Sequence, residues 1–223
     1  MGDKYDQKLM INTINSHSYN VAQMDREFYK ALMKSDMLIP DGVGIVFALR
    51  FLANVRINKI AAWELMIYEL ENLNKIGGKC FFLGSSQHVL DLVVHRASKE
   101  YPNVKIASYS PPYKAVFTDE DNNKMIEAVN AFAPEVLFVG MTAPKQEKWI
   151  AAHFDRLNIK HSGSIGATFD FYAGTIKRAP AWLVNKNLEW FYRLVREPKR
   201  VWRRYILGIP KFAYFIVKEK FNY

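Results

Sequence analysis

Asp41 is the residue of this sequence best placed to do acid–base chemistry. It stands between Pro40 and Gly42, after a short apolar run typical of a strand and before an apolar stretch of helical length. A carboxylate at the carboxyl end of a strand can accept a proton from a substrate hydroxyl group. An aspartate before a helix can also be an ordinary N-cap. The closely spaced glycines that follow Asp41 favour the catalytic interpretation.

Four more turns follow predicted strands and carry glycine or small polar residues. Such turns can direct backbone amides and the positive end of a helix at an anion. One such turn is weak evidence, because these loops often need glycine for geometry alone. Five on one predicted edge favour a nucleotide or another phosphate-bearing ligand, with Gly84 and Gly140 as candidate binding positions. The five turns are residues 13–15, 40–44, 84–86, 140–146 and 163–167, and His17 follows the first closely enough to reach the same pocket.

Lys145 opens the helix predicted after Pro144. Acidic side chains usually favour that end of a helix, because the backbone dipole is positive there. A lysine placed against the dipole suggests an anionic ligand that holds it, although a merely solvated lysine fits the pattern equally well.

The carboxylates and histidines show no metal-binding pattern. Asp119 and Asp121 form a D-x-D string, which holds a metal in many sugar transferases, but Thr118 before it and the helix after it favour a capping turn. The five histidines lack metal-ligand spacing, and Cys80 is the single cysteine. We therefore expect no metal ion and no cofactor apart from the substrates.

The elements that must position these residues alternate along the chain. This alternation predicts an α/β fold, with a Rossmann-like, mostly parallel sheet and helices on both faces. In such sheets ligands bind beyond the carboxyl ends of the strands, where the five turns lie. The expected strands are 9–14, 36–39, 79–83, 104–109, 135–139 and 159–165, and the expected helices are 21–34, 43–54, 63–74, 86–99, 122–132 and 144–153.

The charge divides the chain into two parts. The 223 residues have a formal net charge of +9, yet residues 1–176 carry equal numbers of basic and acidic side chains. The whole excess therefore lies in the last part of the chain, with three of the five tryptophans. We expect a catalytic domain over residues 1–180 and a helical, basic and aromatic appendage over residues 181–223. Such a segment suits an anionic lipid surface or nucleic acid.

Several classes of protein are disfavoured. Half of the residues are hydrophobic, which rules out a disordered chain. The sequence has neither G-x-x-x-x-G-K-[ST] nor G-x-G-x-x-G, which argues against P-loop enzymes and nicotinamide-dependent dehydrogenases. No apolar run reaches the roughly 18 residues of a membrane-spanning helix, and no cleavable leader opens the chain, so we expect a cytoplasmic protein.

A set of short strings covers nearly the whole chain in one order: Thr13–Asn15, Leu38–Gly44, Phe81–Gly84, Leu137–Trp149, Gly166–Gly174, Lys177–Pro180 and the tail residues from Leu188 to Tyr205. Together they resemble the WecG/TagA/CpsF glycosyltransferases, glycosyltransferase family 26. Each string alone is weak, but the ordered set is specific.

The resemblance implies an inverting, metal-independent transfer of a sugar from a UDP-sugar to a polyprenyl-diphosphate-linked sugar. The implied sugars are N-acetylmannosamine, its uronic acid or glucose, used in teichoic-acid, enterobacterial common antigen or exopolysaccharide synthesis. It also implies a peripheral location on the inner face of the cell membrane. By resemblance, Asp41 is the general base, Thr13 and Asn15 line the acceptor or sugar pocket, and Gln146 binds the donor.

One segment departs from the family pattern. Where the family has R-x-x-G-x-D-L, this chain has lysine at Lys59 and glutamate at Glu64. Lysine cannot make the bidentate contact that arginine makes with a phosphate. Lys59 is therefore a candidate substrate-binding residue with an altered role, and the donor sugar can differ from that of better-known members. Two alternatives stay open: a catalytically degenerate member, or an α/β protein that binds nucleic acid through its basic tail.

The tail arginines are candidates for binding a diphosphate. We expect a charged helix through Arg193 to Arg204, punctuated by Pro198 and Pro210, on which either Arg193, Arg196 and Arg200 or Arg196, Arg200 and Arg203 share a face. A departing diphosphate, the acceptor's diphosphate and anionic lipid headgroups would suit them equally. We expect the tail to bind an anionic membrane and to fold over the pocket, we expect no nucleic acid as a partner, and the apolar tail favours self-association away from the membrane. The candidate residues are Arg193, Arg196, Arg200, Arg203, Arg204 and Trp202.

Overall fold

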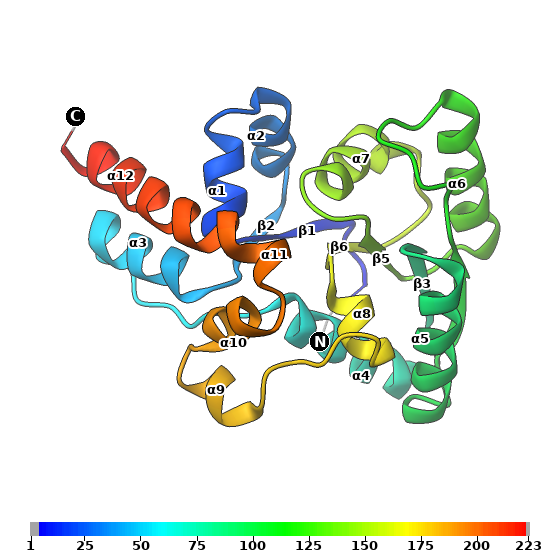
Figure 1. The fold of residues 1–223 in the computed structure, drawn as a ribbon. Helices are drawn as coiled ribbons and strands as arrows, with labels where there is room; N and C mark the ends of the chain where they lie inside the picture. The colour runs from blue at the N-terminus through cyan, green and yellow to red at the C-terminus, as the bar shows by residue number, and fades with distance from the viewer. Residues whose placement is uncertain (1–4, 222–223) are drawn as a thin grey trace.

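A six-stranded sheet forms the centre of the protein in the computed structural model, which describes residues 5–221 (Figure 1). All strand pairs are parallel, and the order is β2-β1-β6-β5-β3-β4. This confirms the predicted α/β class. The strands are β1 (Leu9–Ile14), β2 (Met37–Pro40), β3 (Lys79–Gly84), β4 (Lys105–Tyr109), β5 (Val136–Gly140) and β6 (His161–Ser164).

Alternate residues of each central strand enter two different hydrophobic clusters. Phe82 and Phe138 pack under α4 (Ala62–Ile76), α5 (Gln87–Glu100) and α8 (Thr168–Ala173). Phe81 and Leu137 pack under α6 (Asp119–Phe132) and α7 (Lys145–His153), which a short 3₁₀ turn (Phe154–Arg156) follows. Successive side chains of a strand point to opposite faces of the sheet. A strand whose sheet is covered by helices on both faces is therefore apolar at nearly every position. The helices on both faces therefore follow from the strand sequences.

The amino-terminal helices differ from the prediction. The single helix expected over residues 21–34 is two helices, α1 (Ser16–Ala22) and α2 (Arg26–Met33). Asn15 caps the first, and Asp25 caps the second by accepting a hydrogen bond from the Phe28 amide (3.0 Å). The prediction was wrong because α1 is mostly polar and lacks an apolar period, whereas its cap, Asn15, is a local signal.

The tail also differs from the prediction. It forms α9 (Ala181–Asn185), α10 (Glu189–Arg196), α11 (Pro198–Trp202), a π-helical turn (Arg203–Leu207) and α12 (Gly208–Phe221). The charged helix expected from Arg193 to Arg204, with Pro198 punctuating it, is divided at Glu197, which has φ −127° and ψ 51°. Proline disfavours helical geometry in the residue before it, so Pro198 explains the break.

Helix α12 packs against α1 and against α3 (Val43–Ala53), and all three lie side by side in Figure 1. Phe212 and Ile216 of α12 share a hydrophobic cluster with Ile45 and Ala48 of α3. The end of the chain is thereby joined to the sheet-bearing body by a small core of its own. Among residues 5–221, no helix combines the length and the apolar character needed to cross a bilayer.

Candidate active site

The turns after β1 and β2 form one packed unit at the carboxyl edge of the sheet. The Asp41 amide donates a hydrogen bond to the Ile14 carbonyl (2.8 Å). Asn15 Oδ1 accepts from the amides of His17 and Ser18, both at 3.1 Å, and so begins α1. A side chain at Gly44 would overlap Ser16. The structure therefore brings Asp41, Asn15 and His17 into one neighbourhood, as the sequence predicted.

Asp41 is half-buried at the start of α3. The pKa of its carboxyl group is raised to about 6, mainly by burial and also by Glu189 of α10 and Glu64 of α4, whereas Arg204 and Lys59 oppose the rise. Gly42, at φ 130°, is the N-cap of α3, so Asp41 itself does not cap that helix. The ordinary capping role that the sequence left open is thus excluded, and a carboxyl group that titrates near neutrality is suited to accept a proton.

Arg204 is the tail cation that acts most directly on this carboxylate. It is half-buried, and burial lowers the pKa of its guanidinium, as do Arg193 and Arg200, whereas Asp41 raises it. Burial and Arg204 together lower the pKa of His17, so its ring is neutral at pH 7. Arg193 Nε is buried without a hydrogen-bond partner. Arg204 thus acts on the carboxylate of Asp41, and Arg193 and Arg200 act on Arg204, a group of arginines suited to an anion with several oxygen atoms.

Arg196, Arg203 and Trp202 lie elsewhere in the tail. Arg196 is exposed, stands over the Tyr192 ring (5.7 Å), and lines an open groove of about 300 Å³ with Lys177. Arg203 is exposed and stands over the Trp202 ring (5.3 Å). The helix break before Pro198 separates Arg196 on α10 from Arg200 on α11. The predicted role of these arginines in binding a diphosphate stays a prediction.

Thr13 lies at the end of β1 and is buried against β6. Its amide donates to Ser164 Oγ (3.4 Å), and its hydroxyl donates to the Ser164 carbonyl (3.5 Å). These long hydrogen bonds place Thr13 between the two central strand ends. Its predicted role in the substrate pocket stays a prediction.

Gln146 connects two turns of the carboxyl edge. Its Oε1 accepts hydrogen bonds from the amides of Met141 (3.2 Å) and Gly166 (3.1 Å), and its Nε2 donates to Glu147 Oε1 (2.9 Å). The side chain is 3% exposed. Its amide oxygen therefore holds the β5–α7 and β6–α8 turns together, which favours a positioning role over the donor contact implied by the resemblance.

Gly84 and Gly140 are close-packed against protein. A side chain at Gly84, which has φ 114°, would overlap the carbonyl of Gly140, and one at Gly140 would overlap the ring of Phe169. Both glycines are buried. Packing alone explains them, so the structure adds no support to their predicted role in substrate binding.

We predict that Gly140→Ala lowers the free energy of unfolding by about 1–3 kcal/mol, because the added methyl group has no space beside Phe169. The measurement is the midpoint of urea unfolding. An unchanged slope of the unfolding free energy against urea concentration would show that the substitution leaves the unfolded state unaltered. Gly208→Ala is the matched control, since its nearest contacts are 3.7 Å away. Unaltered stability in Gly140→Ala with weakened donor binding would restore the ligand role.

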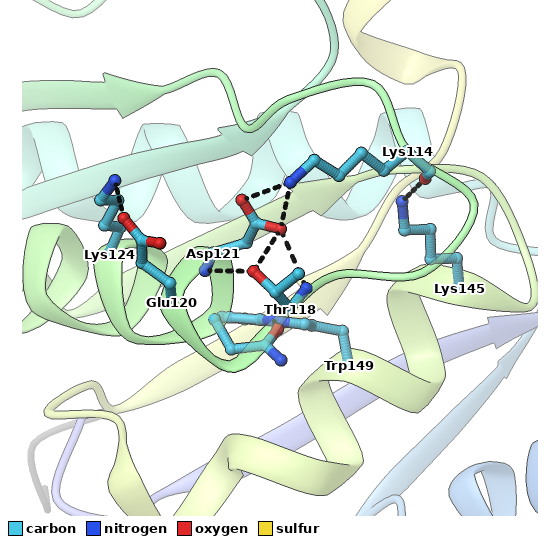
Figure 2. Close-up of polar contacts among 8 residues, drawn as sticks. Lys114, Thr118, Glu120, Asp121, Lys124, Lys145 and Trp149 are labelled. Atoms are coloured by element: carbon cyan, nitrogen blue, oxygen red, sulfur yellow. Dashed lines mark hydrogen bonds and ion pairs between the residues drawn. The ribbon is translucent and has the colours of Figure 1, made fainter.

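Lys145 and the D-x-D string lie in one corner, drawn in Figure 2. Thr118 and Asp121 cap α6 reciprocally, and Lys114 pairs with Asp121 (2.8 Å), which confirms the capping interpretation of the D-x-D string. Lys145 donates to the Lys114 carbonyl, and its ammonium group stands 3.5 Å from the centre of the Phe117 ring. The protein itself thus supplies partners for Lys145, so its position needs no anionic ligand.

Lys59 and Glu64, the departures from the family pattern, connect the body to the tail. Lys59 Nζ donates to the Val184 carbonyl (3.4 Å) and acts electrostatically on Asp41. Glu64 accepts from the Ala61 amide (2.8 Å) and pairs with Arg178 (2.8 Å). Lys59 therefore lies near Asp41, and its ammonium group is also hydrogen-bonded to the tail.

Sequence reasoning missed two acidic residues of this region. Glu189 acts on the pKa of Asp41, and Asp170 has a raised pKa because of burial, with Arg200 opposing the rise. Both lie inside strings that carried the resemblance, which was the only available signal. Within residues 5–221, no three histidine, cysteine or acidic side chains gather in a way that could hold a metal ion.

Comparisons with known proteins agree with this architecture. The model of the glycosyl transferase WecG/TagA/CpsF family matches residues 3–223. A Bacillus subtilis relative is 36% identical over 97% of this chain and 83% of its own length. Relatives from Bacillus spizizenii (30% identical, 88% of this chain, 74% of theirs) and Staphylococcus aureus strain MRSA252 (30%, 95% and 81%) also match. All three are named N-acetylglucosaminyldiphosphoundecaprenol N-acetyl-beta-D-mannosaminyltransferases.

The parallel sheet and the carboxylate at its edge are those of an α/β enzyme, and the relatives define its class as a glycosyltransferase. The chain belongs to the WecG/TagA/CpsF family of glycosyltransferases.

Proposed function

We propose that this enzyme transfers N-acetylmannosamine from a UDP-sugar to a polyprenyl-diphosphate-linked N-acetylglucosamine, with inversion and without a metal ion. The observation that carries the proposal is Asp41, a carboxyl group with a pKa of about 6 beside Arg204. The names of the relatives support the sugar and the lipid-linked acceptor. The uronic acid and glucose remain alternative donor sugars, because Lys59 replaces the family arginine.

In the proposed mechanism Asp41 takes the proton from the acceptor hydroxyl as its oxygen attacks the anomeric carbon. The bond between that carbon and the diphosphate oxygen breaks on the opposite face of the sugar. Arg193, Arg200 and Arg204 neutralise the charge that develops on the departing diphosphate. A base contributes roughly 10²–10⁴-fold to the rate of such a step.

The proposed place of action is the inner face of the cell membrane, with the tail against anionic lipid. The acid-free stretch from Pro198 to Lys218 and its exposed aromatic side chains support lipid rather than water as the neighbour of the tail. We propose no nucleic acid as a partner, since family membership assigns the basic tail to an enzyme. Self-association away from the membrane stays part of the proposal.

The test is UDP release in lipid vesicles, with a panel of UDP-sugars and a lipid-diphosphate-linked N-acetylglucosamine, with and without EDTA. We expect release from UDP-N-acetylmannosamine that EDTA leaves unchanged. Release that EDTA abolishes and Mg²⁺ restores would overturn metal independence. Donor binding without release from any donor, in folded protein, would indicate the catalytically degenerate member instead.

We predict that kcat/KM falls on the acidic side of a pKa near 6, by about fivefold between pH 6 and pH 5, as protonation removes the base. The sign follows from the role of Asp41, which accepts a proton only when ionised. Initial rates from pH 5 to 8 measure this limb. A rate that stays flat down to pH 5 would contradict the assignment.

A further inference from the structure

The outer face of α3 is apolar and uncovered in the described part of the chain. Phe47 is 64% exposed and stacks on Phe51, with ring centres 6.2 Å apart and planes 6° from parallel. Val43, Val55, Ile57 and Ile60 extend this exposed surface along the helix and the loop after it. Large apolar side chains grouped in this way usually mark an interaction surface.

The inner face of the same helix is already in use. Ile45 and Ala48 are buried against Phe212 and Ile216 of α12. At the far end, Lys220 of α12 stands 5.5 Å from the centre of the Phe51 ring and donates to the Leu52 carbonyl (3.4 Å). Figure 1 shows α3 and α12 projecting side by side from the sheet. The apolar face of α3 is therefore continuous with the end of α12, where Val217 and Phe221 are exposed.

The charge around this surface is mostly positive, and Glu219, the acidic residue between Val217 and Phe221, accepts a hydrogen bond from the Tyr19 hydroxyl. Residues 42–63 contain no aspartate or glutamate, and they include Arg50, Arg56 and Lys59. Residues 198–218 of the tail are also free of acidic residues. An apolar centre bordered by lysine and arginine matches an anionic bilayer surface.

The helices α5, α6 and α7 have the opposite character. None of the exposed large hydrophobic side chains of the described chain lies on them. Their surfaces carry balanced ion pairs, such as Arg96 with Glu100 and Lys124 with Glu120. The surfaces of α5, α6 and α7 are thus poorly suited to lipid, in contrast to the apolar and basic surface of α3 and the tail.

We propose that α3 is a second bilayer-inserting element, carried by the catalytic body, with Phe47 and Phe51 in the boundary between headgroups and acyl chains. The proposal rests on the membrane association proposed above and adds to the tail a surface on the body. Arg50, Arg56 and Lys220 then contact anionic headgroups. A second copy of the chain is a poorer occupant, because a symmetric contact would set these cations against their own copies without a neutralising carboxylate.

This placement has a geometric consequence for the acceptor. Helix α3 begins two residues after Asp41 and is about 16 Å long by its residue count. If α3 lies in the plane of the membrane–water interface, Asp41 stands at the level of the lipid headgroups. A diphosphate attached to a lipid would then meet Asp41 and Arg204 without leaving the bilayer surface.

Single-site labelling tests the proposal directly. Cys80 is fully buried, so an environment-sensitive dye reacts with an introduced surface cysteine. Phe47→Cys reports on α3, Tyr214→Cys on the tail, and Met33→Cys is the control, because Met33 on α2 is as exposed as Phe47 (65% against 64%). With vesicles of phosphatidylglycerol and phosphatidylcholine, we expect a blue shift of the dye at positions 47 and 214 and none at position 33.

Each other outcome has a definite meaning. A shift at position 214 without one at position 47 overturns this inference and leaves the proposed membrane association intact. No shift at either position, with wild-type protein that stays in the supernatant, overturns both. A shift at position 47 that depends on protein concentration and needs no vesicles identifies a second copy as the occupant and also overturns the inference.

A partition measurement gives the size of the effect. We expect Phe47→Ser to weaken co-sedimentation with the same vesicles by about tenfold, through loss of one inserted aromatic side chain. Met33→Ser should leave partition unchanged. Equal losses in the two variants, or none in Phe47→Ser, would contradict insertion of α3.

Discussion

Replacing Asp41 by asparagine is expected to lower kcat by about 10²–10⁴-fold, because the amide keeps the shape of the side chain but cannot accept the proton of the acceptor hydroxyl. Donor affinity should change little, since the proton moves only during the chemical step. The measurement is steady-state UDP release with saturating donor and acceptor, together with donor binding by calorimetry.

The folded state of this variant provides an internal check. The pKa of Asp41 is raised in the folded protein, so the wild type gains stability as the pH falls from 7 through about 6 towards the ordinary pKa of aspartate. Asp41→Asn lacks this gain and should be no less stable than the wild type at pH 7. Asp91→Asn on α5, which keeps an oxygen that can accept from the Gln87 amide, is the control and should keep full activity. A variant at position 41 with more than about a tenth of wild-type kcat would remove the base assignment.

Arg204→Met is the second large effect. We expect kcat to fall by about 10²–10³-fold, the usual result of removing one donor from a developing anion. The loss should be accompanied by a move of the acidic limb of kcat/KM to higher pH, because Arg204 lowers the pKa of Asp41. A role in folding alone would not shift this limb.

The neighbouring arginine is a matched control. Arg203 has the same charge and lies one residue away, but it is exposed over Trp202. Arg203→Met should therefore leave kcat and the acidic limb of the kcat/KM profile unchanged, and should lose at most some affinity for anionic vesicles. Equal losses of kcat in the two variants would show that the tail acts through its overall charge, and the specific role of Arg204 would be withdrawn.

The sheet was predictable because its strands are buried on both faces. Runs such as Cys80–Leu83 and Val136–Val139 are apolar at every position, which short strands between helices require. Helix α1 was not predictable from periodicity, because it is held by the cap at Asn15 and by packing against α12, an element almost two hundred residues later in the chain. The break at Glu197 had its signal in Pro198. The surroundings of Arg196 and Arg203, however, depend on tertiary packing.

The candidate site divides in the same way. Asp41 could be found because its neighbours, Pro40 and Gly42, are local and unusual. Gln146 could not be assigned, since a glutamine beside a glycine turn can face a ligand or bridge two turns, and only the distances to Met141 and Gly166 separate these cases. Glu189 acts on Asp41 through space, with no local pattern that a single sequence reveals.

The joining of α12 to α3 has a consequence for how the enzyme is made. Asp41 and α3 leave the ribosome early, whereas Arg204 and α12 follow every other described element. Until then Ile45 and Ala48 lack their contacts with Phe212 and Ile216, and a nascent chain exposes more of this apolar helix to chaperones or to lipid. Asp41 likewise lacks Arg204. Synthesis of the tail therefore completes this cluster and the proposed site together, and we expect a chain that stops before Arg204 to lack full activity.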